Sequence, residues 1–337
     1  MKKFAIFILS LGLAVQALAI EEAKLTSNEF LNNILPYVLQ HVNRGSFQGV
    51  DNKKINYYVM PAAQPKGVIV LSPGQSESSL KYSELLFDWR DLGYTIYVID
   101  HRGQGESDRL LTDPIKSHVV RFSDYVTDFE TFVLQVVHPE RYSSSFLMAH
   151  SMGGTIASGF LIRHPKTFTA AILSAPMLEI NTGYPQLGSY VLAAILDNPL
   201  LATDYAPTQK PYGTDTFATN IVTSSQARYQ LRVDLYDKYK GLRVGGTTNS
   251  WLHESLGYTA ILRTTKNIYQ IPTLMFQAGK DHLVEPRGQN VTCLQNSPQF
   301  CKLLLFPTSQ HEILMEKDAI RNQALGLIEK FIADHTK

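Results

Sequence analysis

The sequence predicts an α/β fold, in which a doubly wound, mostly parallel sheet carries an inserted helical cap. Short apolar runs rich in β-branched residues alternate with helical patterns along most of the 337-residue chain. The alternation stops between about residues 177 and 270 and resumes at Thr273. No internal repeat or low-complexity run is present, so one large domain with an insertion accounts for the length.

The expected strands are continuous apolar runs, which are typical of strands covered by helices on both faces. They are Val68–Ser72, Thr95–Asp100, Phe146–Ala149, Ala170–Ser174, Thr273–Ala278 and Leu303–Phe306.

Helices are expected between and around these strands. From Phe122 to His138, apolar residues recur every three or four positions, and Pro139 marks the end of the run. The remaining predicted helices are Asn28–Val42, Thr155–Ile162 and Lys317–His335, with Leu187–Leu196 and Ser224–Tyr239 inside the insertion.

The first nineteen residues differ from the rest of the chain. Lys2 and Lys3 precede an apolar run that ends in Ala17-Leu18-Ala19, a small-x-small pattern. This pattern predicts a secretory signal peptide at residues 1–19, with the mature domain from residue 20. The run of about 16 residues is shorter than the roughly 20 that span a bilayer. An uncleaved anchor in the inner membrane is the alternative.

Charge and cysteine content limit the function classes. The formal net charge is +1, and loss of Lys2 and Lys3 leaves 29 basic against 30 acidic residues. Without a basic stripe, we expect no nucleic-acid partner. In an exported protein, the pair Cys293 and Cys301 favours a disulfide over a metal site, although two unpaired cysteines remain the alternative. We expect no metal and no cofactor.

A nucleophile candidate follows the third expected strand. Ala149-His150-Ser151-Met152-Gly153-Gly154 joins that strand to a helical run, and Ala149 occupies the first position of the G-x-S-x-G pattern. A sharp strand-to-helix turn holds such a serine out at the carboxyl edge of the sheet, and small neighbours permit the turn. Ser151 is therefore the predicted nucleophile of a serine hydrolase with the α/β-hydrolase fold.

A serine nucleophile needs a base and an orienting acid, which in this fold follow on later strands in the order Ser, Asp, His. Asp281 follows the strand that begins at Thr273, and His311 follows the strand that begins at Leu303. We therefore predict that Asp281 is the acid and His311 the base. Glu285 is the alternative acid, and His282 the alternative base.

The tetrahedral intermediate of acyl transfer requires preorganised N–H donors. One is expected from Met152, the residue after the nucleophile. The other is expected from Gln75, in the loop after the first apolar strand, where Gly74 allows close approach. The glycine-containing loop from Asp100 to Ser107 is interpreted as a supporting loop beside the site.

Taken together, these segments resemble the monoglyceride-lipase and lysophospholipase branch of the α/β-hydrolases, and especially bacterial lysophospholipases. The resemblance runs from about Phe47 to the last helix. It rests on Pro73-Gly74 with Glu77-Ser78 and Lys81-Tyr82, the Asp100–Ser107 loop, the Ser151 turn, Ser174-Ala175-Pro176-Met177, Arg243-Val244-Gly245-Gly246 with Trp251 and Glu254-Ser255, and His311-Glu312-Ile313-Leu314.

The resemblance implies hydrolysis of the acyl ester of lysophospholipids through an acyl-enzyme. A monoacylglycerol lipase, a short-chain carboxylesterase or, less closely, a serine aminopeptidase are the alternatives. The apolar segment from Tyr190 to Leu196 could line an acyl channel, touch a membrane surface or pack on the core. With the predicted signal peptide, a periplasmic or secreted location is expected.

Overall fold

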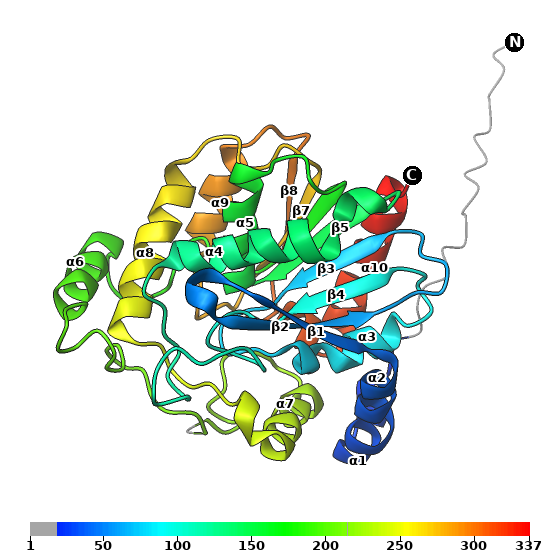
Figure 1. Ribbon diagram of the computed structural model, residues 1–337, viewed down its shortest axis with the longest axis horizontal. Helices are drawn as coiled ribbons and strands as arrows, with labels where there is room; N and C mark the ends of the chain where they lie inside the picture. The colour runs from blue at the N-terminus through cyan, green and yellow to red at the C-terminus, as the bar shows by residue number, and fades with distance from the viewer. Residues whose placement is uncertain (1–18, 214) are drawn as a thin grey trace, which may run out of the picture.

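The computed structural model describes residues 19–213 and 215–337, and a mixed sheet runs through its centre (Figure 1). Eight strands lie in the order β1-β2-β4-β3-β5-β6-β7-β8. β2 pairs antiparallel with both β1 and β4, and the other neighbours are parallel. The strands are β1 Asn43–Gln48, β2 Lys54–Met60, β3 Val68–Ser72, β4 Thr95–Ile99, β5 Ser145–His150, β6 Ala170–Ser174, β7 Thr273–Ala278 and β8 Cys301–Phe306.

All six strands expected from the sequence are present, and they form the parallel part of the sheet. β3, β6 and β7 have the predicted bounds, and β4, β5 and β8 each differ from the predicted bounds by one or two residues. The antiparallel β1 and β2 were not predicted. β1 has no buried residue along its length, so it lacks the apolar run by which the other strands were recognised.

Helices cover both faces of the sheet, as predicted for a doubly wound fold. They are α1 Ser27–Glu29, α2 Leu35–His41, α3 Ser83–Asp88, α4 Phe122–Thr131, α5 Met152–Arg163, α6 Gln186–Leu196, α7 Gln226–Lys238, α8 Asn249–Thr264, α9 Pro286–Leu294 and α10 Asp318–His335. A π-helical stretch, Phe30–Ile34, joins α1 to α2, and another, Phe132–Val137, extends α4. The chain leaves this second stretch through His138, which has a left-handed φ of 55° immediately before Pro139.

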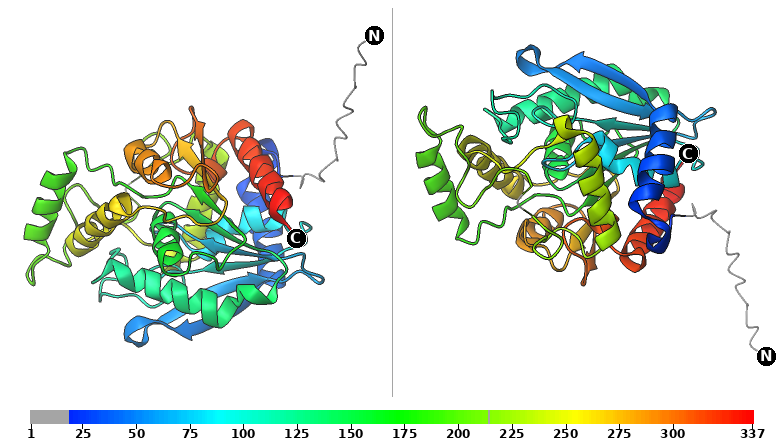
Figure 2. Two further views of the ribbon diagram at one scale, coloured as in Figure 1. Left: turned by 90° about the horizontal axis from the view of Figure 1, so that it is seen from above. Right: turned by 90° about the horizontal axis from the view of Figure 1, so that it is seen from below.

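The core consists of two apolar clusters, one on each face of the sheet. Side chains that alternate along β3 separate into them: Ile69 and Leu71 face one cluster, and Val68 and Val70 face the other. The first cluster includes side chains of α2, α3, α7 and α10, and the second includes side chains of α4, α5 and α8. Figure 2 shows α10 beside the N-terminal helical segment. Both faces are thereby kept from water.

The chain between β6 and β7 forms α6, α7 and α8, which occupy the stretch that the sequence analysis assigned to a helical insertion. α8 packs against α4 and α5, and its Trp251 and Leu262 join the core cluster on that face. α6 lies beside α8 at the periphery of the molecule in every view (Figures 1 and 2). α6 is thus the most outlying helix of this segment.

Two further observations concern export and membranes. Cys293 at the end of α9 and Cys301 at the start of β8 form a disulfide, as the sequence favoured. Among residues 19–213 and 215–337, no helix is both long enough and apolar enough to cross a bilayer. The predicted signal peptide, apart from Ala19, lies outside the described residues.

The packing of α5 on α4 generates a stability prediction. Phe160 on α5 is fully buried and contacts the rings of Phe129 and Phe168. Phe160→Ala should lower the free energy of unfolding by about 3–5 kcal/mol, because it leaves a cavity that the helices cannot close. Urea unfolding followed by circular dichroism measures the change.

Ile162 on the same helix is the matched control, since 39% of it is exposed. Ile162→Ala should cost about 1 kcal/mol or less. Equal costs for the two variants would contradict the assignment of Phe160 to the core.

Candidate active site

Ser151 lies on a sharp turn between β5 and α5. Its backbone has φ 51° and ψ −120°, a combination that residues with a side chain rarely adopt. The turn is held from both sides, because the N–H of Ser151 donates to the carbonyl of Ser174 at 3.1 Å and the N–H of Met177 donates to the carbonyl of Ser151 at 2.9 Å. Hydrogen bonds to the segment after β6 thus stabilise the strained backbone.

Two glycines after Ser151 give the turn the space that it needs. A Cβ on Gly153 would lie 2.0 Å from the carbonyl oxygen of Ser72, and one on Gly154 would lie 2.4 Å from the Cβ of Pro176. Any side chain at these positions would push α5 away from β3 and from the loop after β6. The glycines of the sequence pattern are therefore required by close packing.

The side chains of Ser151, His311 and Asp281 form a continuous hydrogen-bonded chain. The Nε2 atom of His311 lies 2.8 Å from the Oγ atom of Ser151, and its Nδ1 atom lies 2.7 Å from Oδ2 of Asp281. The three residues follow β5, β7 and β8, whose carboxyl ends lie at one edge of the parallel sheet. The structure thus brings together the three residues that the sequence singled out.

Asp281 is held as an ionised acceptor. Its Oδ1 atom accepts the backbone N–H groups of Leu283 and Val284 at 2.8 and 3.0 Å. Burial by itself would raise the pKa of Asp281, but the attraction of His311 and these hydrogen bonds lower it below its usual value. The carboxylate is therefore suited to orient His311 and to stabilise its positive charge.

The alternative acid and base lie elsewhere. Glu285 occupies the position before α9 and donates its N–H to the carbonyl of Glu179, while His311 faces Asp281. His282 is exposed, and the interaction of Asp281 with His311 leaves His282 outside the chain of contacts. His150 hydrogen-bonds the carbonyl of Ser174 through Nδ1, which agrees with a part in the turn.

The loop after β3 contains the predicted backbone donor, the N–H of Gln75. The N–H of Gly74 donates to Oε2 of Glu77 at 2.6 Å, and the N–H of Ser76 donates to Oε1 of Gln104 at 3.2 Å. The N–H groups on either side of Gln75 are therefore already engaged in hydrogen bonds within the protein. Ser76 has a left-handed φ of 61°, which turns the chain immediately after Gln75. The loop geometry agrees with the donor role expected for the N–H of Gln75.

Met152 is the first residue of α5 and is fully buried. The first N–H groups of a helix have no acceptor within the helix. The N–H of Met152 therefore lies at the amino end of α5 directly after Ser151, where the helix dipole favours negative charge.

A segment from the insertion reaches the same loop. The carbonyl of Gly245 accepts from the Nε2 atom of Gln75 at 3.2 Å and from the Oγ atom of Ser76 at 3.0 Å. The hydroxyl of Tyr236 donates to the carbonyl of Ser76 at 3.2 Å. The insertion is thus connected by hydrogen bonds to the loop that carries the candidate oxyanion donor.

The Asp100–Ser107 loop contacts the segment after β3 and helix α4. Asp100 accepts the N–H of Ser79 at 2.6 Å, and burial raises the pKa of Asp100 to about 6. Arg102 is buried in an ion pair with Asp128 of α4, with 2.6 Å between Nε and Oδ2. These contacts agree with the structural interpretation of the loop.

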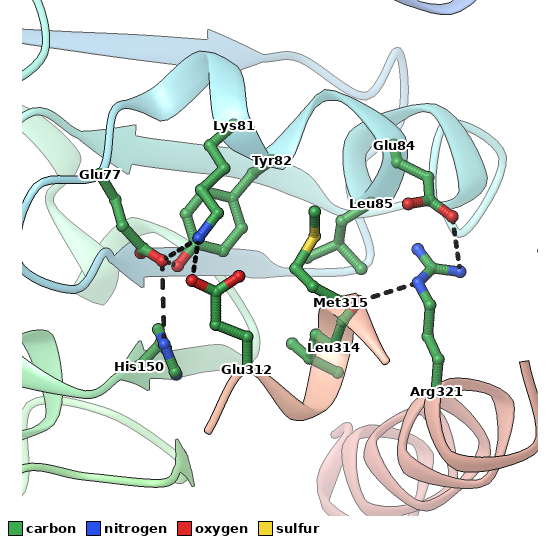
Figure 3. Close-up of a pocket in the computed structure, with 10 residues that line it drawn as sticks. All are labelled: Glu77, Lys81, Tyr82, Glu84, Leu85, His150, Glu312, Leu314, Met315 and Arg321. Atoms are coloured by element: carbon green, nitrogen blue, oxygen red, sulfur yellow. Dashed lines mark hydrogen bonds and ion pairs between the residues drawn. The ribbon is translucent and has the colours of Figure 1, made fainter. Parts of the chain in front are cut away.

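A buried charged cluster beside the turn was not predicted as part of the site. Glu77, Lys81 and Glu312 meet there, with Tyr82 and His150 beside them (Figure 3). They line a cavity of about 30 Å³, which has room for water but not for an acyl chain. The i, i+4 spacing of Glu77 and Lys81 was a signal in the sequence, whereas the proximity of Glu312 was not.

One cluster combines residue types that bind metals. Asp197, His253 and Glu254 place potential ligand atoms within 4.8 Å of one another between the end of α6 and α8. Each is already engaged, because His253 hydrogen-bonds Asp197 at 2.7 Å and Glu254 accepts the N–H of Phe122. These hydrogen bonds connect α8 to the end of α6 and to the start of α4, which explains why the three side chains lie together.

A serine on a strained strand-to-helix turn, hydrogen-bonded to a histidine and an aspartate at the carboxyl edge of a mostly parallel sheet, defines the class of α/β-hydrolases. The sequence model of the family described as "Serine aminopeptidase, S33" matches residues 63–318, and the chain belongs to this family.

Within this family, the chain is similar to proteins named as lipid hydrolases. The chain is 35% identical over 310 residues to lysophospholipase L2 of Escherichia coli strain K12, which covers 87% of this chain and 88% of the relative. It is 26% identical over 292 residues to the monoacylglycerol lipase of Mycolicibacterium smegmatis, covering 86% of this chain and 96% of that protein.

Solved structures share the fold. A soluble variant of the monoglyceride lipase from Saccharomyces cerevisiae, in complex with a substrate analogue, aligns with a TM-score of 0.68 at 19% identity. The alignment covers 88% of this chain and 95% of that one. At this identity, the likeness concerns the fold.

The packing around the turn generates a prediction for Gly153. Gly153→Ala should lower the free energy of unfolding by about 1–3 kcal/mol, because the new methyl group meets the rigid backbone of Ser72. Thermal unfolding of the purified variant measures the loss.

Gly188 in α6 is the matched control, since a Cβ there has no neighbour within 4 Å. Gly188→Ala should raise the stability by up to about 1 kcal/mol through helix propensity. A Gly153→Ala variant as stable as Gly188→Ala would show that the turn has space that the geometry denies.

Proposed function

We propose that this protein hydrolyses the acyl ester of lysophospholipids through an acyl-enzyme on Ser151. The observation that carries the proposal is the hydrogen-bonded chain from Ser151 through His311 to Asp281. The names of the relatives, lysophospholipase L2 and monoacylglycerol lipase, support a single-chain acyl lipid as the substrate.

In the first step, the Nε2 atom of His311 accepts the proton of Ser151 while Oγ attacks the ester carbonyl carbon. Asp281 stabilises the imidazolium that forms. The backbone N–H groups of Gln75 and Met152 donate to the oxyanion of the tetrahedral intermediate. As the intermediate collapses, the glycerol oxygen leaves with the proton from His311, and the acyl group stays on Ser151.

In the second step, water replaces the alcohol. His311 accepts a proton from the water as its oxygen attacks the acyl carbonyl, and the same two N–H groups stabilise the oxyanion. Collapse returns the proton to Ser151 and releases the fatty acid.

The acidic side chains near the insertion disfavour an aminopeptidase. A pocket for a substrate amine needs unpaired carboxylates, but Glu179 is paired with Arg287 and Arg263. Asp197 is likewise hydrogen-bonded to His253. Two of the carboxylates that could hold a substrate amine are therefore already paired, which favours the ester of a lipid, although the family carries an aminopeptidase description.

The surface of α6 supports contact with lipid. Leu187 and Ile195 are 76% and 65% exposed, and Leu192 is 50% exposed. No residue of α6 carries a charge. A helix with an exposed apolar face binds the interface of a bilayer, where single-chain lipids reside. We propose that α6 makes this contact transiently.

We also propose that the protein is exported to the periplasm or secreted. The pattern of residues 1–19 supports a signal peptide. The disulfide between Cys293 and Cys301 is a second support, because such bonds persist in oxidising compartments.

A substrate panel tests the function. Fatty-acid or product release should be fastest, by kcat/KM, on lysophosphatidylcholine and lysophosphatidylethanolamine. Monoacylglycerol, a short-chain nitrophenyl ester and an aminoacyl anilide complete the panel. Ser151→Ala should lower the rate by at least about 10⁴-fold, because the acyl-enzyme cannot form.

The acid supplies an internal control for this panel. Asp281→Asn should lower kcat about 10⁴-fold, whereas Glu285→Gln, at the alternative position, should stay near the wild-type rate. Preference for the anilide, or a full rate in Ser151→Ala, would contradict the proposal.

The proposed role of α6 generates a separate prediction. Leu192→Gln and Ile195→Gln should each lower hydrolysis of long-chain lysophospholipid in anionic vesicles about 5-fold, because each loses roughly 1 kcal/mol of apolar contact. Hydrolysis of the soluble short-chain ester should stay within about 2-fold.

Leu294→Gln is the matched control, since this leucine is 84% exposed on α9 and outside α6. It should leave both rates unchanged. Equal losses on both substrates in the α6 variants would mean that α6 serves the fold and not the lipid surface.

A further inference from the structure

Lys81 is buried between two carboxylates that belong to different loops of the site (Figure 3). Its Nζ atom lies 2.6 Å from Oε1 of Glu77 and 2.7 Å from Oε1 of Glu312. Only 4% of the Lys81 side chain is exposed. One ammonium group therefore joins segments that are far apart in the sequence.

Glu77 determines the shape of the loop that carries Gln75. Its Oε2 atom accepts the N–H of Gly74 and the hydroxyl of Tyr82, each at 2.6 Å. Lys81 holds the other oxygen of the same carboxylate. A change in the position of Glu77 would therefore move the backbone directly before Gln75.

Glu312 directly follows His311 in the sequence, and both are buried or nearly so. Its side chain turns away from Ser151 toward Lys81, while His311 faces Ser151. Its backbone N–H donates to the carbonyl of Val222 at 2.8 Å. The contact of Glu312 with Lys81 thus helps to fix the backbone that places the imidazole.

The charges in this cluster depend on one another. Burial by itself would raise the pKa of Glu77 and of Glu312, but the attraction of Lys81 lowers both. Burial would likewise lower the pKa of Lys81, but Glu312 and Glu77 raise it. Without the ammonium group, Glu77 and Glu312 would face each other with Arg232 as the remaining cation that acts on Glu312, and the repulsion between the two carboxylates would push the two loops apart.

A purely stabilising role does not explain this arrangement. Buried ion pairs are seldom more stabilising than apolar side chains of similar volume, because desolvation offsets the attraction. The chain also contains a comparable group, in which Arg102 bridges Asp128 and Asp124 and contacts neither Ser151, His311 nor the Gln75 loop. That second group has a similar arrangement of buried charges without a direct contact to the acyl-transfer residues, so it serves as a comparison.

We propose that Lys81 is a positioning residue that sets the spacing between the Gln75 loop and His311. The oxyanion donor and the base act on the same tetrahedral centre, so their separation must stay constant through both steps. This inference rests on the proposed function, because it assigns Lys81 to the acyl transfer at Ser151.

The experiment compares Lys81→Met with Arg102→Met in the full-length protein. Both variants remove a buried cation that bridges two carboxylates, so both should lower the melting temperature. Lys81→Met should lower kcat on lysophosphatidylcholine about 10- to 100-fold, because small displacements of reacting groups have effects of this size. KM should change less than about 2-fold, and Arg102→Met should keep the wild-type kcat at a temperature where both are folded.

A fluorophosphonate probe gives a second measure, since its reaction with Ser151 needs the base and the oxyanion donors but no lipid surface. The labelling rate of Lys81→Met should fall in parallel with kcat, and Lys81→Arg, which keeps the charge, should recover most of it. Equal kcat in Lys81→Met and Arg102→Met would overturn the proposal.

If Lys81→Met does not fold, Glu312→Gln decides the question, because it leaves the pair of Lys81 and Glu77 intact. A lower kcat at constant KM supports the positioning role, and an unchanged kcat overturns it. A wild-type protein that neither hydrolyses the lipid nor reacts with the probe would overturn the proposed function and this inference together. Normal wild-type activity with unchanged variants would overturn only the role of Lys81.

Discussion

The strained backbone of Ser151 is the constraint on which the site depends. A positive φ at a residue with a side chain is unfavourable, and it persists only where the surroundings determine it. Here Gly153 and Gly154 leave space for the backbone of β3 and for the loop after β6. Hydrogen bonds from Ser151 to Ser174 and from Met177 to Ser151 hold the turn. The strain has a direct consequence, because it lifts the Oγ atom out of the sheet toward His311. The fold therefore holds the nucleophile in place before any substrate arrives.

Two groups of charged side chains lie near Ser151, and they have different roles. Asp281 and His311 form one oriented pair whose charge changes during acyl transfer. In the cluster of Glu77, Lys81 and Glu312, two carboxylates share one ammonium group. The fixed cluster holds the loops, and the oriented pair moves the proton. The lowered pKa of Glu77 and of Glu312 and the raised pKa of Lys81 favour the charged forms of all three groups, which keeps them apart from the proton transfer at His311.

The insertion connects the exposed helix α6 to the loop of Gln75. α6 carries the exposed apolar side chains at the periphery, whereas Gly245 and Tyr236, later in the same insertion, contact the loop of Gln75. His253 and Asp197 tie the end of α6 to α8, which packs on the main domain. The insertion that carries the exposed helix α6 therefore also contacts the loop of Gln75.

The sequence by itself determined the parallel part of the sheet, its alternation with helices, and the three residues Ser151, Asp281 and His311. These features depend on local pattern: strands buried on both faces are apolar throughout, and residues that follow parallel strands meet at one edge of the sheet. The antiparallel β1 and β2 and the helices α3, α8 and α9 were not predicted, and β1 has no buried residue by which it could be recognised. Only the tertiary structure decided that Lys81 lies between Glu77 and Glu312, since 231 residues separate Lys81 from Glu312 in the chain. It also decided which face of α6 remains exposed, because a run of apolar residues does not say what, if anything, covers it.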